Sequence, residues 1–356
     1  MADTRFYDGT KLLSLKDLDG LQPEIYICTT NRSAGKTTYF GRMFVNRFLN
    51  HDEKFALLYR FKYELNNIGD KFFKDIGALF FPGWTMQGES RVNGIYHDLY
   101  LIRVNADGTS GEKLHCGYAL TLNSADNVKK LSHLFSDVQR ILFDEFQPET
   151  NTYCPNEIIK FQSIHTSLAR GQGKQSRYLP VYMLGNNVTL LNPYYVEFGI
   201  AARLDASTKF MRGHGWVLEQ GFNESAAKAQ QESGFNRAFS SSAYSSSAFQ
   251  GSYLYDNQAF VERLSGNSKY LCTLRYMGKD YGVREFVDQG LLYCDDRPDS
   301  TFKYRISVTT EDHNINFVML RSNSVFLQTL KYYFDHGCFR FKNIMCKDAI
   351  IKALAY

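Results

Sequence analysis

The sequence predicts an α/β protein in which parallel strands alternate with helices, and two observations support this prediction. Apolar, β-rich segments recur between helical or loop stretches at residues 25–29, 55–60, 117–122, 140–144 and 178–185. Such alternation is typical of a sheet with substantial parallel character. A phosphate-loop pattern also lies between the first of these segments and a helical stretch at residues 38–49. A strand, a tight loop and a helix in this order are typical of a nucleotide-binding fold.

The phosphate loop has the form x-x-x-x-x-G-K-[ST] and carries Thr30 where a glycine is usual. Backbone N–H groups and the positive end of the following helix would face a phosphate chain. Lys36 would place a charge on the β- and γ-phosphate oxygens, and the Thr37 hydroxyl would bind Mg²⁺. An ordinary turn before a helix is the alternative for this pattern alone. We expect ATP to be bound by Thr30, Asn31, Arg32, Ser33, Ala34, Gly35, Lys36, Thr37 and Thr38.

A second half of a nucleotide-hydrolysis site follows about a hundred residues later, where the apolar segment at 140–144 ends in Asp144 and Glu145. Asp144 is expected to be the acid on the metal side, holding Mg²⁺ through water. Glu145 is expected to activate the attacking water, which requires a carboxylate beside the metal. An apolar run that ends in two acids is also common as a plain strand end, so each motif is weak alone. Together and in this order, the two motifs predict an ATPase that uses ATP and Mg²⁺.

Three further features are candidates for a role in hydrolysis. Arg32 could reach the γ-phosphate or pair with the catalytic carboxylate between cycles, or it could be a solvated loop residue. Asn186 follows the strand at 178–185, and ligands in α/β folds bind at the carboxyl ends of strands, although a turn-forming role is equally compatible with its sequence. The loop at 169–177 is basic and punctuated by glycine, so it could contact a neighbouring subunit's nucleotide or be merely solvated.

The chain of 356 residues is too long for one typical core, which predicts two domains. We expect an ATPase domain at 1–220 with a hairpin insertion at 94–122, a linker at 221–256 and a small α+β domain at 257–356. The linker is expected because residues 239–252 are rich in serine and small side chains. The last domain shows strand-like segments at 270–274, 281–287 and 290–294, and two helices within 324–354 divided near Gly337.

Charge and cysteine usage limit the partners and the compartment. A net charge of +4 is compatible with a nucleic-acid partner but does not establish one. The 7 cysteines lack C-x-x-C spacing, which favours free thiols in a reducing cytoplasm. The N-terminus lacks an apolar signal region and an 18-residue apolar stretch occurs nowhere, so we expect neither secretion nor a membrane partner.

The motifs resemble those of a known family, the DNA-packaging ATPases of phi-29-type tailed phages, which are small relatives of the large terminases. Arginine at the third position of the phosphate loop, as Arg32 is here, is typical of terminases. Short matching blocks occur in the same order along most of the chain, at residues 6–7, 11–14, 32–36, 46–48, 59–65, 143–146, 155–157, 185–186, 192–194, 256–258 and 288–291.

The resemblance implies a P-loop NTPase of the additional-strand, conserved-glutamate type, with helices on both faces of its sheet. It implies a C-terminal domain of the RNase H type that has lost its nuclease site. The protein would be a double-stranded DNA translocase that forms a homo-oligomeric ring, a pentamer in this family. The ring would dock in the host cytoplasm at the portal vertex of an empty capsid, where a structural RNA could mediate docking.

The resemblance also assigns roles to residues outside the two motifs. Asn186 would couple hydrolysis to movement. Arg170 would be an arginine finger acting in trans, with Arg177 as the alternative because the match through this loop is gapped. Lys62 matches a basic position that would face a neighbouring subunit.

Three lysines and one expected strand bear on DNA binding and on nuclease activity. Lys113, Lys129 and Lys130 are candidate DNA-backbone contacts or ordinary solvated lysines. The expected first strand of the C-terminal domain, residues 270–276, carries no acid, and a cluster of carboxylates is needed to hold two metals. The alternatives that stay open are an active terminase nuclease, a small-molecule P-loop kinase, and a structural ring component whose ATP site is vestigial.

Overall fold

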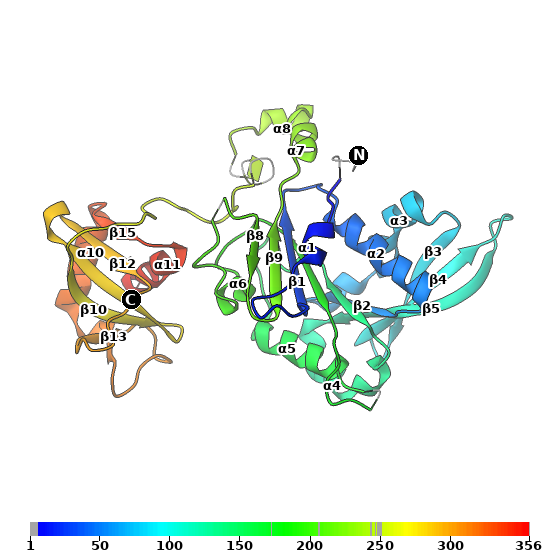
Figure 1. Ribbon diagram of the computed structural model, residues 1–356, viewed down its shortest axis with the longest axis horizontal. Helices are drawn as coiled ribbons and strands as arrows, with labels where there is room; N and C mark the ends of the chain where they lie inside the picture. Colours follow the sequence, from blue (N-terminus) through cyan, green and yellow to red (C-terminus); the bar gives the residue numbers. More distant parts are fainter. Residues whose placement is uncertain are drawn as a thin grey trace. The chain divides into compact units, whose positions relative to one another are not determined.

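The computed structural model describes residues 6–171, 173–205, 207–242, 244–245, 247 and 251–355 (Figure 1). The chain divides into two compact units. One contains the residues up to Glu197 together with Asp205–Tyr255, and the other contains Phe198–Leu204 and the residues from Asp256 onward. The second unit therefore begins one residue before position 257. Residues 221–255, which we expected to form a separate linker, are instead grouped with the first unit.

The first unit is built on a nine-stranded sheet with the order β3-β4-β5-β2-β6-β7-β1-β9-β8. The six strands from β5 to β9 in this order are parallel, and β3, β4 and β8 are antiparallel to their neighbours. This confirms the predicted sheet of mainly parallel character. Its strands are β1 (Ile25–Thr30), β2 (Phe55–Tyr59), β3 (Trp84–Arg91), β4 (Tyr96–Val104), β5 (Ser110–Thr121), β6 (Arg140–Phe143), β7 (Val181–Asn186), β8 (Phe210–Arg212) and β9 (Trp216–Gln220).

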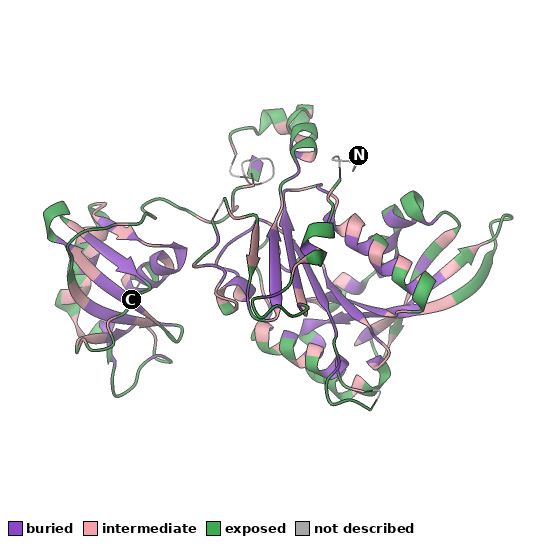
Figure 2. Ribbon diagram, in the orientation of Figure 1, coloured by how far each residue is buried: buried purple, intermediate pink, exposed green. Residues whose placement is uncertain are grey.

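Helices cover both faces of this sheet, as alternate residues of β6 show. Leu142 lies in the buried cluster that contains residues of the helices α2 and α3. Its neighbour Phe143 faces the other way and stacks on Phe161 of α5, with 6.1 Å between the ring centres. The strands between these layers are buried, whereas the far end of the β4–β5 hairpin is exposed (Figure 2). The helical segments of the unit are α1 (Thr10–Ser14), α2 (Lys36–His51), η1 (Lys62–Leu65), α3 (Ile68–Phe80), η2 (Leu122–Ser124), α4 (Ala125–Lys130), η3 (Ser132–Phe135), α5 (Glu157–Leu168), α6 (Pro193–Glu197), α7 (Glu224–Gln231) and α8 (Gly234–Ala238).

The second unit contains a six-stranded sheet with the order β14-β13-β10-β11-β12-β15. The strands β10, β11 and β12 form an antiparallel meander, and β13 and β14 add in parallel beside β10. The strand β15 pairs in parallel with β12. The elements are β10 (Lys269–Tyr276), β11 (Lys279–Phe286), η4 (Val287–Gln289), β12 (Leu291–Asp295), β13 (Arg305–Ser307), β14 (Val318–Met319), η5 (Leu320–Ser322), α10 (Ser324–Asp335), β15 (Phe339–Phe341) and α11 (Ile344–Leu354). None of the described helices in either unit is long and apolar enough to cross a membrane.

Candidate nucleotide site

The phosphate loop lies at the carboxyl end of β1, between the ends of β7 and β9. Gly35 caps the following helix α2 with φ +94°, a left-handed conformation that glycine adopts without a side-chain clash. Ser33 also has a positive φ of +59°. The loop therefore turns sharply before α2 begins at Lys36, and the helix N-terminus presents unpaired backbone N–H groups toward an anion.

Lys36 is held against the end of β7. Its Nζ donates a hydrogen bond to the Oδ1 atom of Asn186 at 2.7 Å, and only 8% of the residue is exposed. Burial lowers the pKa of Lys36, while the nearby charge of Asp144 opposes this shift. The structure thus brings together three predicted site residues, the lysine, the amide and the acid, which lie far apart in the sequence.

The paired acids follow β6 and differ in their surroundings. Asp144 is half-buried, and its carboxylate lies near the Thr37 hydroxyl and the Lys36 ammonium. Burial raises the pKa of Asp144, and Lys36 and Thr37 oppose the rise. Glu145 is exposed and has φ +55°. Partial loss of water raises its pKa, and the negative charges of Asp144 and Glu149 raise it further. A hydroxyl and a carboxylate near each other are the hard oxygen ligands that Mg²⁺ prefers, so the residues present fit this ion.

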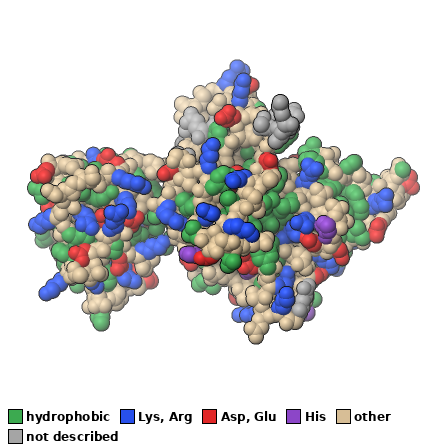
Figure 3. All heavy atoms as spheres, viewed as in Figure 1, with side chains coloured by type: hydrophobic (Ala, Val, Ile, Leu, Met, Phe, Trp, Pro, Cys, Tyr) green, Lys and Arg blue, Asp and Glu red, His purple; other side chains and the backbone are tan. Residues whose placement is uncertain are grey.

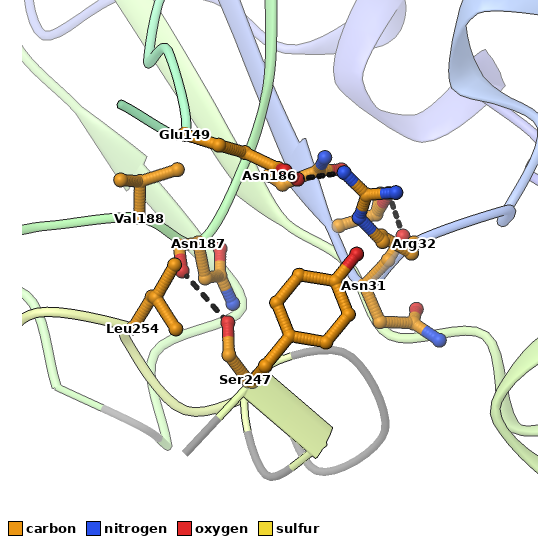
Figure 4. A pocket seen from close by; sticks show the side chains of 10 residues that line it. Asn31, Arg32, Glu149, Asn186, Asn187, Val188, Ser247 and Leu254 are labelled. Atoms are coloured by element: carbon orange, nitrogen blue, oxygen red, sulfur yellow. Dashed lines mark hydrogen bonds and ion pairs between the residues drawn. The ribbon is translucent and has the colours of Figure 1, made fainter. Parts of the chain in front are cut away.

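Arg32 does not pair with Glu145, which was one of its two expected roles. Its guanidinium forms an ion pair with Glu149, and lies over the ring of Tyr244 at 5.3 Å from the ring centre. Glu149 follows Asp144 and Glu145, the two acids after β6, by only a few residues. Arg32, Glu149 and Asn186 line one small pocket (Figure 4).

The side chain of Asn31 is also engaged within the protein. Its amide hydrogen-bonds with both backbone groups of residue 223, and the residue is 1% exposed. Only its backbone N–H remains available for a nucleotide. The sequence could not show this, because the partner lies 192 positions away.

Sequence reasoning also missed a role for Arg60, which directly follows β2. Its Nη1 and Nη2 donate to the backbone carbonyls of Glu145, at 2.7 Å, and of Phe146, at 2.5 Å. Its Nη2 and Nε also contact Glu157, at 2.8 and 3.1 Å. Both side chains are almost fully buried, at 4% and 1% exposed. Arg60 therefore fixes the backbone of the turn that carries Glu145. The available signal was an arginine within a segment expected to be buried, which needs a buried acid as partner.

The two arginines considered for the trans finger have different environments. Arg170 is exposed, just after α5. Arg177 is 9% exposed, and its Nη2 donates to the carbonyl of Leu168 at 2.8 Å. Burial lowers the pKa of Arg177. These positions favour Arg170 as a side chain able to reach another molecule. Lys62 is exposed in η1, beyond the carboxyl end of β2.

The three candidate DNA-contacting lysines are not equivalent. Lys129 and Lys130 are exposed at the end of α4. Lys113 forms an ion pair with Glu89 and lies over the ring of Tyr100 at 4.2 Å, so it is partly engaged within its own hairpin. On the face shown in Figure 3, basic side chains are interspersed with acidic and uncharged ones rather than gathered in one patch.

A large cavity, distinct from the small pocket lined by Arg32 and Glu149, also borders the phosphate loop. Its volume is about 870 Å³, and it is lined by the loop residues Thr30 and Ala34 together with Phe6, Phe222 and Asn223 among others. Phe6 and Phe222 are 60% and 49% exposed. The cavity therefore offers aromatic and polar side chains next to the loop.

The described residues of the second unit show no cluster of acids that could hold two metal ions. Among the described residues, no group of three or more His, Cys, Asp or Glu side chains could hold a metal ion. The strand β10 carries Arg275, which pairs with Asp280 at 3.1 Å, and no acid. Three nearby aspartates each have another partner: Asp295 accepts from Arg284, Asp296 from Lys342, and Asp299 from Thr301.

Comparison with known proteins places the chain in a family. The model of the family described as Podovirus DNA encapsidation protein (Gp16) matches residues 1–354. The DNA packaging protein of Bacillus phage phi29 is 26% identical over 360 residues, covering 100% of this chain and 97% of the relative. That of Bacillus phage B103 is 26% identical over 316 residues, covering 88% and 90%.

Solved structures agree with the sequence comparison. A chain of the bacteriophage Phi-29 viral genome packaging motor assembly superimposes with a TM-score of 0.66 at 25% identity, covering 99% of this chain and 98% of that one. A chain of the Phi-28 gp11 DNA packaging motor shares the fold, with a TM-score of 0.54 at 13% identity and 99% coverage of both chains. The resemblance predicted from the short motifs is therefore confirmed, and the chain belongs to the Podovirus DNA encapsidation protein (Gp16) family.

Proposed function

We propose that this chain is the ATP-driven double-stranded DNA translocase that packages a viral genome into a preformed capsid. The observation that carries the proposal is the meeting of Lys36 and Asn186 beside Asp144 at the carboxyl ends of three parallel strands. Such an edge is where α/β folds bind ligands. Membership in a DNA encapsidation family supplies the process that the ATPase drives.

The nucleotide chemistry follows from the positions of these side chains. Backbone N–H groups of residues 30–38 and the Lys36 ammonium hold the phosphates, and Thr37 and Asp144 hold Mg²⁺. When bound there, Mg²⁺ would supply positive charge to balance the charge that develops on the γ-phosphoryl group. Glu145 orients and activates the attacking water, and Asn186 senses the γ-phosphate through its contact with Lys36. The cavity beside Thr30 and Ala34 has room for the base and ribose, with Phe6 and Phe222 as stacking partners.

The strand order supports a more specific class, the additional-strand, conserved-glutamate NTPases. The strand β7, which ends in Asn186, lies between β1 with its phosphate loop and β6 with its paired acids. That intervening strand is the feature from which the class takes the first part of its name, and Glu145 would be its glutamate.

We infer that the second unit is an RNase H-like domain without nuclease activity. Its antiparallel meander β10-β11-β12 and the parallel addition of β13 and β14 beside β10 support the fold. The lack of an acid on β10 and the engagement of Asp295, Asp296 and Asp299 by other side chains or turns support the loss of activity. A docking role toward the portal, the capsid or a structural RNA then remains for this unit.

Ring formation is supported by the position of Arg170. The helix α5 starts at Glu157, which binds the same Arg60 that holds the Glu145 backbone, and it runs for 12 residues toward Arg170. At 1.5 Å per residue the helix separates the two ends by ~18 Å. Arg170 is therefore too far to complete its own site, and we propose that it acts on a neighbour's nucleotide. Lys62 would face the same interface, in a homo-oligomeric ring, a pentamer by family resemblance, docked on the procapsid in the host cytoplasm.

DNA would be gripped through its phosphates, since a packaging motor must pass any sequence. The exposed Lys129 and Lys130 are the proposed contacts, and Lys113 is a weaker candidate because of its bond to Glu89. Neutralising Lys129 and Lys130 together should reduce the salt dependence of DNA binding. An unchanged salt slope would remove both residues from the interface.

The decisive experiment measures ATP hydrolysis by the purified protein with and without duplex DNA of unrelated sequences. A DNA translocase should hydrolyse ATP faster with any duplex, and it should leave the DNA uncut. Phosphate transfer to a small molecule without response to DNA would identify a kinase instead. Metal-dependent cleavage of the DNA, lost on substituting Asp295, Asp296 and Asp299, would identify an active terminase nuclease.

A further inference from the structure

The side chain of Asn31 connects the phosphate loop to the start of the segment that leads to the second unit. Its Nδ2 donates to the carbonyl of residue 223 at 3.0 Å, and its Oδ1 accepts from the N–H of the same residue at 2.8 Å. The strands β1 and β9 are paired up to Thr29 and Gln220. The Asn31 amide thus extends the pairing of these two chain segments beyond the point where the strands separate.

Residues 223–255, which we call the linker segment, contact the next two loop residues as well. The side chain of Asn223 caps α7 by accepting a hydrogen bond from the N–H of Ala226 at 2.8 Å. Within α7, the Nε2 of Gln230 donates to the Ser33 hydroxyl at 3.1 Å. The ring of Tyr244 lies against the Arg32 guanidinium. Three consecutive residues of the phosphate loop are therefore bound to the linker segment.

The linker segment also contacts the end of β7, next to Asn186. The Nδ2 of Asn187 donates to the carbonyl of Gly251 at 2.8 Å. The backbone carbonyl of Asn187 accepts from the hydroxyl of Ser247 at 3.1 Å (Figure 4). The N–H of Tyr255 donates to the carbonyl of Val188 at 3.0 Å. This is immediately before Asp256, where the second unit begins. The linker segment is thus hydrogen-bonded both to the phosphate loop after β1 and to the residues after β7, and it then continues directly into the second unit.

We propose that Asn31 is a positioning residue that couples nucleotide occupancy of the phosphate loop to the arrangement of the linker segment. The proposal rests on the proposed function, because it requires ATP to bind at this loop. A bound phosphate chain pulls the loop backbone toward itself, and the two hydrogen bonds of Asn31 carry that displacement to residue 223 and the helix that Asn223 caps. Such coupling is reciprocal, so the arrangement of the linker segment must change nucleotide affinity by the same factor.

Asparagine is the residue type that this link requires. A single side chain must donate to a carbonyl and accept from an N–H group, which an amide does and a carboxylate does not. The residue is 1% exposed, so bulk water does not compete for either bond. Loss of the amide leaves both backbone groups of residue 223 without this partner.

Hydrogen exchange of the full-length protein, with and without saturating Mg-ADP, tests the coupling directly. In the wild type, nucleotide should change exchange of amides in the phosphate loop and also in residues 224–238. In Asn31→Ala, the loop amides should still respond at saturating nucleotide, whereas the response of residues 224–238 should be lost. An unchanged response of residues 224–238 in Asn31→Ala, or no response there in the wild type, would overturn the proposal.

A second pair of variants approaches the link from the linker segment and leaves the phosphate loop intact. Asn223→Pro removes the N–H group that donates to Asn31, whereas the matched control Asn223→Ala keeps that N–H and, like proline, lacks a capping oxygen. By reciprocity, Asn223→Pro should bind ADP more weakly than Asn223→Ala, within the ~5–150-fold range usual for coupled sites. Equal affinities by calorimetry would refute the coupling. Failure of the wild type to bind nucleotide in the same assay would instead refute the proposed function.

Discussion

Arg60 is expected to have two roles, which substitutions can distinguish: it stabilises the first unit, and it places Glu145, the proposed catalytic acid. In Arg60→Met, the carboxylate of Glu157 stays buried and keeps only the N–H of Cys154, at 2.7 Å, and the hydroxyl of Tyr194, at 2.9 Å. Breaking a buried ion pair from one side typically costs ~3–5 kcal/mol. We expect a loss of this size in the free energy of unfolding, measured by urea denaturation with a probe in the first unit.

The double variant Arg60→Met, Glu157→Gln isolates the second effect. A neutral amide at 157 removes the unpaired charge and keeps hydrogen bonds with Cys154 and Tyr194, so most of the lost stability should return. The carbonyls of Glu145 and Phe146 still lack their Arg60 donors, and a misplacement of about 1 Å at a reacting group can cost ~10²-fold in rate. The double variant should therefore bind Mg-ATP but hydrolyse it slowly. Hydrolysis at the wild-type rate by this stable variant would show that Arg60 does not position Glu145.

Three further outcomes test the site. Glu145→Gln should bind Mg-ATP and hydrolyse it poorly, because the geometry survives and the water is no longer activated; near wild-type turnover would mean that another acid acts. Arg170→Ala should retain ATP binding and lose DNA-stimulated hydrolysis by ~10³–10⁵-fold, and mixing it with Glu145→Gln subunits should restore some activity; if Arg177→Ala behaves in this way instead, the finger is Arg177. Because burial raises the pKa of Asp144 and loss of water raises that of Glu145 in the free protein, each carboxyl takes up a proton at a higher pH than an ordinary aspartate or glutamate does. The kcat/KM for ATP, which reports the free enzyme, should therefore fall on acidification at a higher pH than the ordinary values of ~3.9 and ~4.3, and a kcat/KM that stays constant down to pH ~4 would contradict these shifts.

The core of the first unit could be predicted because its strands are continuous apolar runs. The expected segments at 25–29, 55–60, 140–144 and 178–185 coincide with β1, β2, β6 and β7 to within a few residues. The strand β3 was missed because it is an edge strand with mostly exposed or half-buried residues, so it shows no apolar run. The strand β9 was missed because its apolar part is short, although it pairs directly with β1.

The candidate site was predictable where a motif is contiguous and not where side chains act across the fold. The loop and the acids were found because their residues are adjacent in sequence. The buried partners of Arg60 and Asn31 lie 97 and 192 positions away. The serine and small side chains at 239–252 predict a linker at 221–256. It packs on the first unit through polar bonds to Asn31, Ser33 and Asn187, which composition does not reveal.

The pairing of Asn31 with residue 223 has a consequence for how this protein can be divided or recombined. A truncation after residue 220 would end the chain just after β9 and remove the hydrogen-bond partner of the buried Asn31. It would also remove the contact of Gln230 with the phosphate loop. A junction after Tyr255 keeps every described contact between the loop and the linker segment. Chimeras that exchange the residues from Asp256 onward between relatives should therefore be joined there, and the linker segment should be inherited together with the phosphate loop that it contacts.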